Sequence, residues 1–502
     1  MMADSGDERT AIRAGAKSPL PWLWSFGALW LTVFAFLLSR HYFFLFDDFG
    51  LLDLAGETSI SNILTSPLFG FYRPVVFLFV KLLASVFSWN LPMGYAIVLA
   101  VVHGLNGVLL GLVLRSLKMP NLTVLSASGL FLLSPWSSEA YSWMSALFDS
   151  LALLFFLLAV LSYVRFLLKK TRLSLAVSAA CLFIAFLCKE NTIALLPVFY
   201  LARVGLGRAR VSKKAGLEFL LFLAVAALFL MIRGSLVGAL GGSYGDLPAL
   251  FSGAHILRNL GQYVLTLIWV GGKSFPGALV LSFIYASIAL LAVFYALVKR
   301  PLAAAALSLT FAVSLVPVLW NSTHLTTSDA GRLLYAPAVF FCALVGVGVQ
   351  NLSLARIRGH ELARKRIFGA AILFGLAGAA ASTVYQANIW RYACGLSKRT
   401  VAYVLRSAHD TDKDLYIRNL PFLFIEGPFV LKSYAFPIYA RHRFGLELRP
   451  IRCDVVHLSY KDIHLIRYGG PEPGGAVRNK DNPPGDELVL DLPLEELRSK
   501  IK

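Results

Sequence analysis

Long apolar runs, one after another and joined by short polar connections, are the feature that most restricts what this chain can fold into. A helix needs roughly 20 apolar residues to cross the bilayer hydrocarbon, which is about 30 Å thick. Hydrophobic residues make up 57% of the 502 residues and charged residues only 15%, which is too apolar for a soluble protein. We therefore expect an α-helical polytopic membrane protein with about eleven transmembrane helices. They are predicted near residues 22–40, 92–115, 121–135, 145–167, 173–188, 191–206, 216–233, 276–298, 302–320, 333–351 and 368–386.

The positions of the Lys and Arg residues support this count. They cluster in the connections at residues 115–118, 165–172, 203–214, 299–300 and 356–366. Cytoplasmic loops carry an excess of Lys and Arg, and with residues 1–21 in the cytoplasm eleven spans place every cluster on that side. Topology therefore explains the net charge of +19, and no nucleic-acid partner is expected.

Residues 41–91 form the first outer loop in this topology. Within it, YRPVVFLFVKLLASVFSW (72–89) is apolar, but it is short for a span and carries Lys81 in its middle. Counting it as a span would move every later basic loop to the outside. We expect a juxtamembrane helix on the outer face instead.

Beyond residue 386 the chain changes character. RYACGLSKRTVAYVLRSA (391–408) has apolar residues at helical spacing, and DLYIRNLP (414–421) and IRCDVVHLSY (451–460) are typical of strands. We expect residues 387–502 to form a small extracytoplasmic α/β domain, and residues 22–386 to form the transmembrane domain.

The ionisable residues of the membrane part gather near the outer face. The acidic ones are Asp47, Asp48, Asp53, Glu57, Glu139, Asp149, Glu190, Asp246 and Asp329, and the basic ones on this side are Arg73, Lys189, His255, Arg258, His324 and Arg332. An ionisable group embedded in a bilayer is costly unless it is paired or hydrated. The gathering therefore indicates a polar site at the outer surface.

Each contributing segment also has an ordinary structural explanation. HYFFLFDDFG (41–50) fits a solvated loop, SPWSSEAYSW (134–143) an interfacial aromatic belt, CKENTIALLP (188–197) a charged hairpin, and HLTTSDAGRLLYAP (324–337) a loop that ends in a snorkelling Arg. Their order along the chain favours one shared site.

That order carries a family resemblance over roughly residues 20–350. An acidic pair after the first span is followed by YRP (72–74), a helix with His103 and Asn106, SPWSSEAYSWMSALFDS (134–150), LCKENTIALLPV (187–198) and GRLLYAP (331–337). The series resembles the C-type (GT-C) membrane glycosyltransferases, and within them the protein O-mannosyltransferases that carry tetratricopeptide repeats. Such repeats are absent here.

The resemblance implies a GT-C-like catalytic domain that performs an inverting sugar transfer. The sugar would pass from a polyprenyl-phosphate donor to a hydroxyl of a protein, lipid or envelope glycan at the outer face. Asp47 would be the base that takes the acceptor proton, with Asp48 as the alternative base or as the group that orients it. Adjacent carboxylates repel, so one of the two is expected to have a raised pKa.

Other residues receive binding roles from their chemistry and from the resemblance. Arg73, Lys189 and Arg332 are the candidates for the donor phosphate. Candidates for sugar or acceptor contacts are Asp149, Glu139, Glu190, Trp143 and His324. No His/Asp cluster with ligand spacing appears beyond the acidic pair, so we expect no metal and no other cofactor.

Other functions stay open at this point. A transferase of the same fold that modifies lipid A or an envelope glycan differs only in its acceptor. A transporter or flippase of a lipid-linked glycan belongs to another class, but it should carry ionisable residues near the midplane and internal repeats. We expect a multi-pass protein of a bacterial inner membrane, with its site and C-terminal domain on the periplasmic or extracytoplasmic side.

Overall fold

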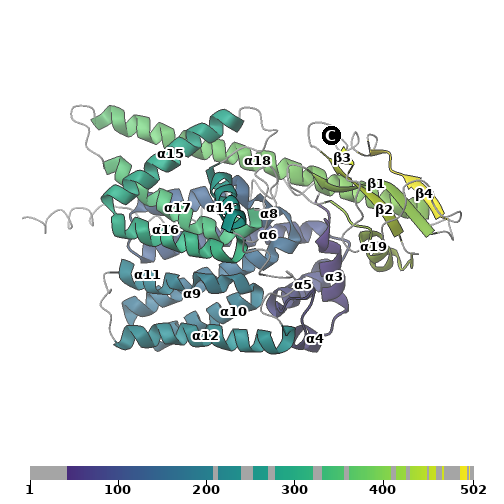
Figure 1. The fold of residues 1–502 in the computed structure, drawn as a ribbon, viewed down its shortest axis with the longest axis horizontal. Helices are drawn as coiled ribbons and strands as arrows, with labels where there is room; N and C mark the ends of the chain where they lie inside the picture. The colour runs from purple at the N-terminus through teal and green to yellow at the C-terminus, as the bar shows by residue number, and fades with distance from the viewer. Residues whose placement is uncertain are drawn as a thin grey trace, which may run out of the picture.

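The structure is a computed structural model. It describes residues 42–206, 213–238, 253–268, 278–319, 331–354, 361–408, 414–424, 430–448, 451–458, 466–467, 487–494 and 497. The predicted cytoplasmic segment 1–21, the predicted first span 22–40 and His324 lie outside these residues. The described part is mostly helical, and one sheet near the C-terminus lies beyond one end of the helix bundle (Figure 1).

Six helices of the described part are long and apolar enough to cross a membrane. They belong to α6 (Pro92–Ser116), α9 (Leu147–Lys169), α12 (Lys213–Val237), α15 (Ala278–Lys299), α16 (Pro301–Leu315) and α17 (Gly331–Leu354). In α6, α9 and α17 the apolar stretch is 67–78% buried, whereas in α12, α15 and α16 only 22–28% is buried. The first three form the centre of the bundle, and the other three leave a large apolar surface exposed, as expected for lipid contact. These features are those of an integral membrane protein.

The structure corrects two of the predicted spans. The segment 121–135 contains α7 (Asn121–Leu132), and the segment 191–206 is divided into η3 (Glu190–Leu195) and α11 (Pro197–Gly205). At 1.5 Å per residue, α7 is about 18 Å long and α11 about 14 Å, against about 30 Å of hydrocarbon. Neither is a single helix of membrane-crossing length, and α10 (Arg172–Cys188), at 17 residues, is also shorter than the six apolar spans, of which the one that starts with α16 continues to Val318. The count of eleven spans stays a prediction.

The long helix α18 (Glu361–Ala408) contains the predicted span 368–386 and the predicted amphipathic helix 391–408. It runs from the bundle to the sheet (Figure 1). The predicted domain boundary after residue 386 thus falls inside a continuous helix, and no linker separates the two parts there.

The segment predicted as the first outer loop folds into α3 (Asp47–Glu57), α4 (Ile60–Thr65) and α5 (Pro74–Phe87). Helix α5 corresponds to the expected juxtamembrane helix. The Lys81 ammonium donates hydrogen bonds to the carbonyl oxygens of Ala55, Gly56 and Thr58, at 3.1, 2.7 and 3.0 Å. These carbonyls lie at the C-terminal end of α3, where a cation is favoured by unpaired carbonyls and the helix dipole. This contact explains a lysine in the middle of an apolar helix.

The sheet near the C-terminus has four strands in the order β3-β2-β1-β4. They are β1 (Asp414–Phe424), β2 (Ile451–Leu458), β3 (Ile466–Arg467) and β4 (Glu487–Asp491). β1 pairs in parallel with β2 and β4, and β3 is antiparallel to β2. The two strands expected from the sequence are β1 and β2, and α19 (Ala435–Phe444) lies between them in the chain.

The sheet and α19 share a hydrophobic core with the first outer loop. Phe44 and Phe49 from the loop belong to the same buried cluster as Ile417, Leu420 and Phe436. The hydroxyl of Ser397 in α18 also donates to the carbonyl oxygen of Phe44 (2.8 Å). The C-terminal part is therefore packed directly against the loop that carries the acidic pair.

Candidate active site

The chain turns sharply before the acidic pair. Phe46 has a positive φ of 41°, which a non-glycine residue adopts only at a cost, and its amide donates to the Val430 carbonyl (3.0 Å). The turn starts α3 at Asp47, so Asp47 and Asp48 occupy the first turn of a helix and point in different directions.

Asp48 points into the protein and is fully buried. One of its carboxylate oxygens accepts a hydrogen bond from the Leu45 amide (3.0 Å), and the other accepts from the Ser145 amide and hydroxyl (both 2.9 Å). The bond back to Leu45 resembles a capping box. Asp48 therefore ties the start of α3 to the segment just before α9.

The environment of Asp48 changes its acidity. Burial raises the pKa of the Asp48 carboxyl from 3.8 to about 7, although the hydrogen bonds from Leu45 and Ser145 oppose this rise. The nearby Asp47 charge adds to the increase. The expected raised pKa within the pair thus belongs to Asp48, and its main cause is loss of solvation.

Asp47 lies at the surface, with 43% of its side chain exposed. The Tyr434 hydroxyl donates to its Oδ1 (3.1 Å), and the Lys432 ammonium lies 3.9 Å from the same oxygen. The Lys432 nitrogen also lies 4.0 Å from the centroid of the Phe46 ring. Neither Lys432 nor Tyr434 was expected in the site, because nothing local in the sequence connects them to a carboxylate nearly 400 residues earlier.

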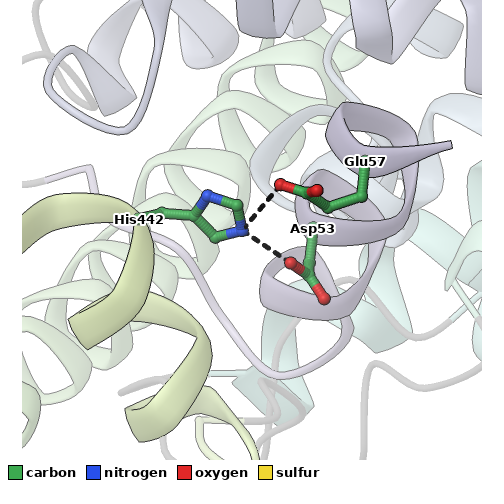
Figure 2. A group of neighbouring side chains, drawn as sticks. All are labelled: Asp53, Glu57 and His442. Carbon is green, nitrogen blue, oxygen red and sulfur yellow. Dashed lines mark hydrogen bonds and ion pairs between the residues drawn. The ribbon is translucent and has the colours of Figure 1, made fainter. Parts of the chain in front are cut away.

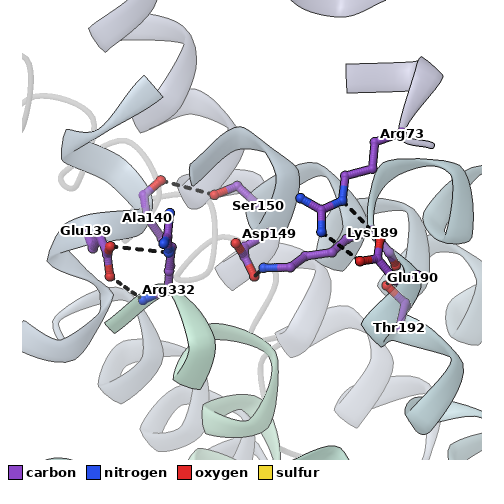
Figure 3. Close-up of polar contacts among 9 residues, drawn as sticks. All are labelled: Arg73, Glu139, Ala140, Asp149, Ser150, Lys189, Glu190, Thr192 and Arg332. Carbon is purple, nitrogen blue, oxygen red and sulfur yellow. Dashed lines mark hydrogen bonds and ion pairs between the residues drawn. The ribbon is translucent and has the colours of Figure 1, made fainter. Parts of the chain in front are cut away.

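Six residues predicted for the site form three ion pairs near one another (Figure 3). The pairs are Arg73 with Glu190 (2.7 Å), Lys189 with Asp149 (2.5 Å) and Arg332 with Glu139 (3.4 Å). They connect α5, α8 (Ser138–Ser142), α9, α10, η3 and α17. The structure thus brings these residues together, but each cation predicted to hold phosphate already has a carboxylate partner.

The strongest of the three pairs is bidentate. Arg73 donates from Nε to Oε2 of Glu190 (2.9 Å) and from Nη2 to Oε1 (2.7 Å). Burial alone raises the pKa of the Glu190 carboxyl, but the charge and hydrogen bonds of Arg73 outweigh this effect and lower it to about 2. This fork geometry fixes the chain before α5 against η3.

Arg332 is held more loosely than the other two cations. Its side chain is 32% exposed, against 8% for Arg73 and Lys189. Its backbone amide donates to Glu139 (2.8 Å), and its guanidinium lies 4.7 Å from the centroid of the Trp143 ring. Trp143 is buried and stacks on Trp390, and its indole NH donates to the Leu45 carbonyl (3.4 Å). Trp143 therefore links Arg332 to the loop of the acidic pair.

Gly331 permits this arrangement through its lack of a side chain. A Cβ at Gly331 would clash with the backbone carbonyl oxygen of Trp136. The start of α17 can approach η1 (Pro135–Ser137) closely only with glycine at this position. The Gly of the GRLLYAP motif is thereby explained by packing.

Three buried serine hydroxyls are close to Glu139 in the sequence. The side-chain oxygens of Ser137, Ser138 and Ser142 are buried and have no hydrogen-bond partner among the described residues. Buried polar groups are normally paired, so these three hydroxyls are exceptions within the described part of the chain. The motif SPWSSEAYSW contains these serines, but only its aromatic residues indicated an interfacial role.

His103 and Asn106 join helices inside the bundle through hydrogen bonds. His103 Nδ1 lies 2.7 Å from the Tyr335 hydroxyl, and the Asn106 amide donates to the same hydroxyl (3.1 Å) and to the Ser150 carbonyl (2.9 Å). The three residues join α6, α17 and α9 inside the bundle.

One group of metal-ligating side chains occurs among the described residues. It consists of Asp53 and Glu57 on α3 and His442 on α19, with their ligand atoms within 4.8 Å of one another (Figure 2). Nothing local in the sequence indicates this group, because His442 is far from the other two residues along the chain. The sequence-based expectation is that the protein holds no metal and has no ligand cluster beyond the acidic pair, and it stays a prediction.

Comparisons with known proteins give distant structural similarities only. No family model matches the chain, and no curated protein matches it. ArnT from Cupriavidus metallidurans, solved with undecaprenyl phosphate, is 12% identical, with a TM-score of 0.45 over 87% of this chain and 86% of that one. The mycobacterial arabinofuranosyltransferase AftD is 15% identical, with a TM-score of 0.47 over 87% of this chain and 33% of that one. The oligosaccharyltransferase AglB from Archaeoglobus fulgidus, solved with an inhibitory peptide and a dolichol-phosphate, is 10% identical, with a TM-score of 0.43 over 84% of this chain and 63% of that one.

Proposed function

We propose that the protein is an inverting glycosyltransferase that moves a sugar from a polyprenyl-phosphate donor to an acceptor hydroxyl. The observation that carries this proposal is the division of roles within the acidic pair. Asp47 is exposed and Asp48 is buried. The sequence order of motifs supplies the reaction class, since it resembles that of the C-type membrane glycosyltransferases.

The division of roles favours transfer in one step. The Asp47 carboxylate takes the proton of the acceptor hydroxyl as that oxygen bonds to C1 of the sugar. The bond from C1 to the phosphate oxygen breaks, and the polyprenyl phosphate leaves with the electron pair. A retaining reaction would need a second carboxylate as nucleophile. Both oxygens of Asp48 already accept hydrogen bonds from Leu45 and Ser145, so Asp48 is unsuited to that role and the configuration at C1 inverts.

The three predicted phosphate-binding cations differ in how readily they can contact a donor. Removing Arg73 or Lys189 from its carboxylate would leave a buried charge unpaired, which is costly. Arg332 is more exposed and its guanidinium makes the longest of the three ion contacts. Lys432 is 30% exposed and lies beside the candidate base. We infer that Arg332 and Lys432 contact the phosphate, and that Arg73 and Lys189 hold the site in shape.

The sugar and acceptor sides are proposed from the remaining groups. Glu139, Asp149 and Glu190 belong to the three ion pairs, and Trp143 contacts Arg332, so we propose these four for sugar or acceptor contacts. Within the reaction class, the DD, YRP and RLLYAP motifs favour a protein O-mannosyltransferase-like enzyme at the outer face of a bacterial inner membrane. A lipid or envelope glycan is the other acceptor class, and the sugar is best identified with a panel of donors.

The test compares Asp47→Asn with the wild type in detergent solution, using a panel of polyprenyl-phosphate sugars and a readout of released polyprenyl phosphate. Loss of a general base costs roughly 10²–10⁴-fold in rate, so turnover should fall by that factor while the thermal midpoint stays unchanged. Asp454→Asn, on an exposed position of β2, is the matched control and should keep full activity. Full activity of Asp47→Asn would overturn the assignment, and a wild type that releases no polyprenyl phosphate from any donor would favour the flippase alternative.

A further inference from the structure

The contact between α3 and α19 contains a group of side chains with the chemistry of a metal site. Asp53 and Glu57 are four residues apart and lie on one face of α3. The Nε2 atom of His442 lies 2.6 Å from Oδ1 of Asp53 and 3.9 Å from Oε1 of Glu57 (Figure 2). Two carboxylates and one imidazole nitrogen therefore converge from two elements that are distant in the sequence.

The imidazole is held in this orientation by a contact on its face. The His442 ring stacks on the Trp89 ring, with 5.0 Å between centroids and 11° between planes. The stack fixes the plane of the ring, and the contact with Asp53 directs Nε2 toward the carboxylates. The Nη2 atom of Arg441 also lies 3.5 Å from this nitrogen.

Arg441 is the competing feature of this group. Its guanidinium donates to Oδ1 of Asp53, the same oxygen that contacts His442. An ionised carboxylate has about four lone-pair sites over its two oxygens, so Asp53 can bind a cation and keep Arg441 as a hydrogen-bond donor. The group nevertheless has two readings, a metal site and an ion-pair cluster, and they predict different experiments.

We propose that Asp53, Glu57 and His442 bind a divalent cation, best matched by Zn²⁺, which clamps α19 onto α3. Zn²⁺ takes His nitrogen and carboxylate oxygen ligands at about 2.0–2.2 Å, so ligand atoms around it lie roughly 3.4 Å apart. The observed separations of 2.6 and 3.9 Å bracket that value. Glu57 is exposed and can adjust by side-chain rotation alone.

The position of the clamp gives it a consequence for the candidate base. Helix α3 starts with Asp47, and α19 directly follows the segment with Lys432 and Tyr434, which contact Asp47. A cation between Asp53 and His442 would hold these two segments together one to two helical turns from the base. Binding itself can be measured without any assay of sugar transfer, so its failure is distinct from failure of the proposed function.

The experiment uses the full chain in detergent, stripped with EDTA and titrated with ZnCl₂. Calorimetry and metal analysis after desalting should show one Zn²⁺ per chain, and hydrogen exchange in residues 435–444 should slow when Zn²⁺ is added. Glu57→Gln should weaken binding by about 10–100-fold or more, and His442→Ala should abolish it. Arg441→Gln removes the competing guanidinium and keeps all three ligands, so it should bind Zn²⁺ at least as tightly as the wild type.

Three results would overturn the proposal. In the first, the wild type binds no stoichiometric Zn²⁺. In the second, His442→Ala and Glu57→Gln bind Zn²⁺ as tightly as the wild type, which means an adventitious ion only. In the third result, Arg441→Gln and His442→Ala speed hydrogen exchange in residues 435–444 equally, and added Zn²⁺ does not slow exchange in either variant. That result would identify an ion-pair cluster instead of a metal site. Glu57→Gln keeps the short contact between Asp53 and His442, so it stays informative if His442→Ala does not fold.

Discussion

Two sides of the candidate site, the helix bundle and the C-terminal part, both contain ion pairs of Lys or Arg with Asp or Glu, but these pairs differ in their exposure to solvent. On the bundle side, the side chains of the pairs Arg73–Glu190 and Lys189–Asp149 are 8–13% exposed. On the C-terminal side, those of Asp47–Lys432 and Asp53–Arg441 are 23–44% exposed. Buried pairs are costly to break, whereas exposed pairs contribute about 0–1 kcal/mol. We propose that the two buried pairs mainly hold the helices in place, and that the more exposed groups Asp47, Lys432 and Arg332 contact substrate.

The largest stability effect is expected from breaking the bundle side at Glu190. In Glu190→Gln the buried Arg73 guanidinium loses its charged bidentate partner, and loss of one member of a buried pair costs about 3–5 kcal/mol. The thermal midpoint of the purified protein should fall strongly. The matched control is Glu447→Gln, since Glu447 is exposed, and its midpoint should stay within error of the wild type. Equal midpoints for both variants would remove the distinction between the two sides.

A smaller stability effect separates the two aspartates of α3. In Asp48→Asn one carboxylate oxygen becomes an NH₂ group, which cannot accept the hydrogen bond from Leu45 or Ser145. Each buried donor left without its acceptor costs about 1–3 kcal/mol in free energy of unfolding. Asp47→Asn should change stability by less than about 0.5 kcal/mol, because it is a surface substitution. Thermal midpoints measured side by side would check this. A more destabilising Asp47→Asn would mean that the assignment of the buried and the exposed carboxylate is wrong.

The pH dependence of stability gives a further test of Asp48. Its folded pKa is raised to about 7 from 3.8, so the folded state holds the proton more tightly than the unfolded chain does. This contribution to the free energy of unfolding is fully present below about pH 4 and is lost as the pH rises through about 7. From about pH 5 to about pH 8, the thermal midpoint of the wild type should therefore fall more than that of Asp48→Asn. An equal or opposite slope would contradict the raised pKa of Asp48.

The smallest effect is expected at Tyr434 on the C-terminal side. Tyr434→Phe removes the hydroxyl that donates to Asp47, and one such hydrogen bond is worth about 0.5–1.5 kcal/mol, or roughly 2–10-fold in rate. The loss should appear in kcat with little change in KM for the donor, since the hydroxyl contacts the base. A purely structural role would instead lower the thermal midpoint and leave kcat intact.

Several parts of the site were predictable because they depend on local sequence. The helical pattern predicted α5 and the helix at 391–408, and the alternating apolar residues predicted β1 and β2. The motif order predicted that Arg73, Asp149, Lys189, Glu190, Glu139 and Arg332 lie together. It did not predict their pairing, because a carboxylate and a cation at the same membrane level can pair with several neighbours.

The lengths of the weaker spans were not predictable in the same way. Apolar composition extends through residues 121–135 and 191–206, so hydropathy alone treats each as one span. The structure ends α7 at Leu132 and starts α11 at Pro197. A proline has no amide hydrogen to donate, so it readily begins a helix and interrupts the preceding one. Helix ends depend on such individual residues more than on average hydrophobicity.

The sequence by itself determined that the chain is an integral membrane protein and that its polar residues gather in a few ordered motifs, since both follow from composition and local order. Only the tertiary structure decided that Asp48 is buried on Ser145, that Asp47 is exposed beside Lys432 and Tyr434, and that His442 meets Asp53. The physical reason is that consecutive side chains in a helix point about 100° apart. Which of two neighbours faces inward, and what it meets there, is set by segments hundreds of residues away.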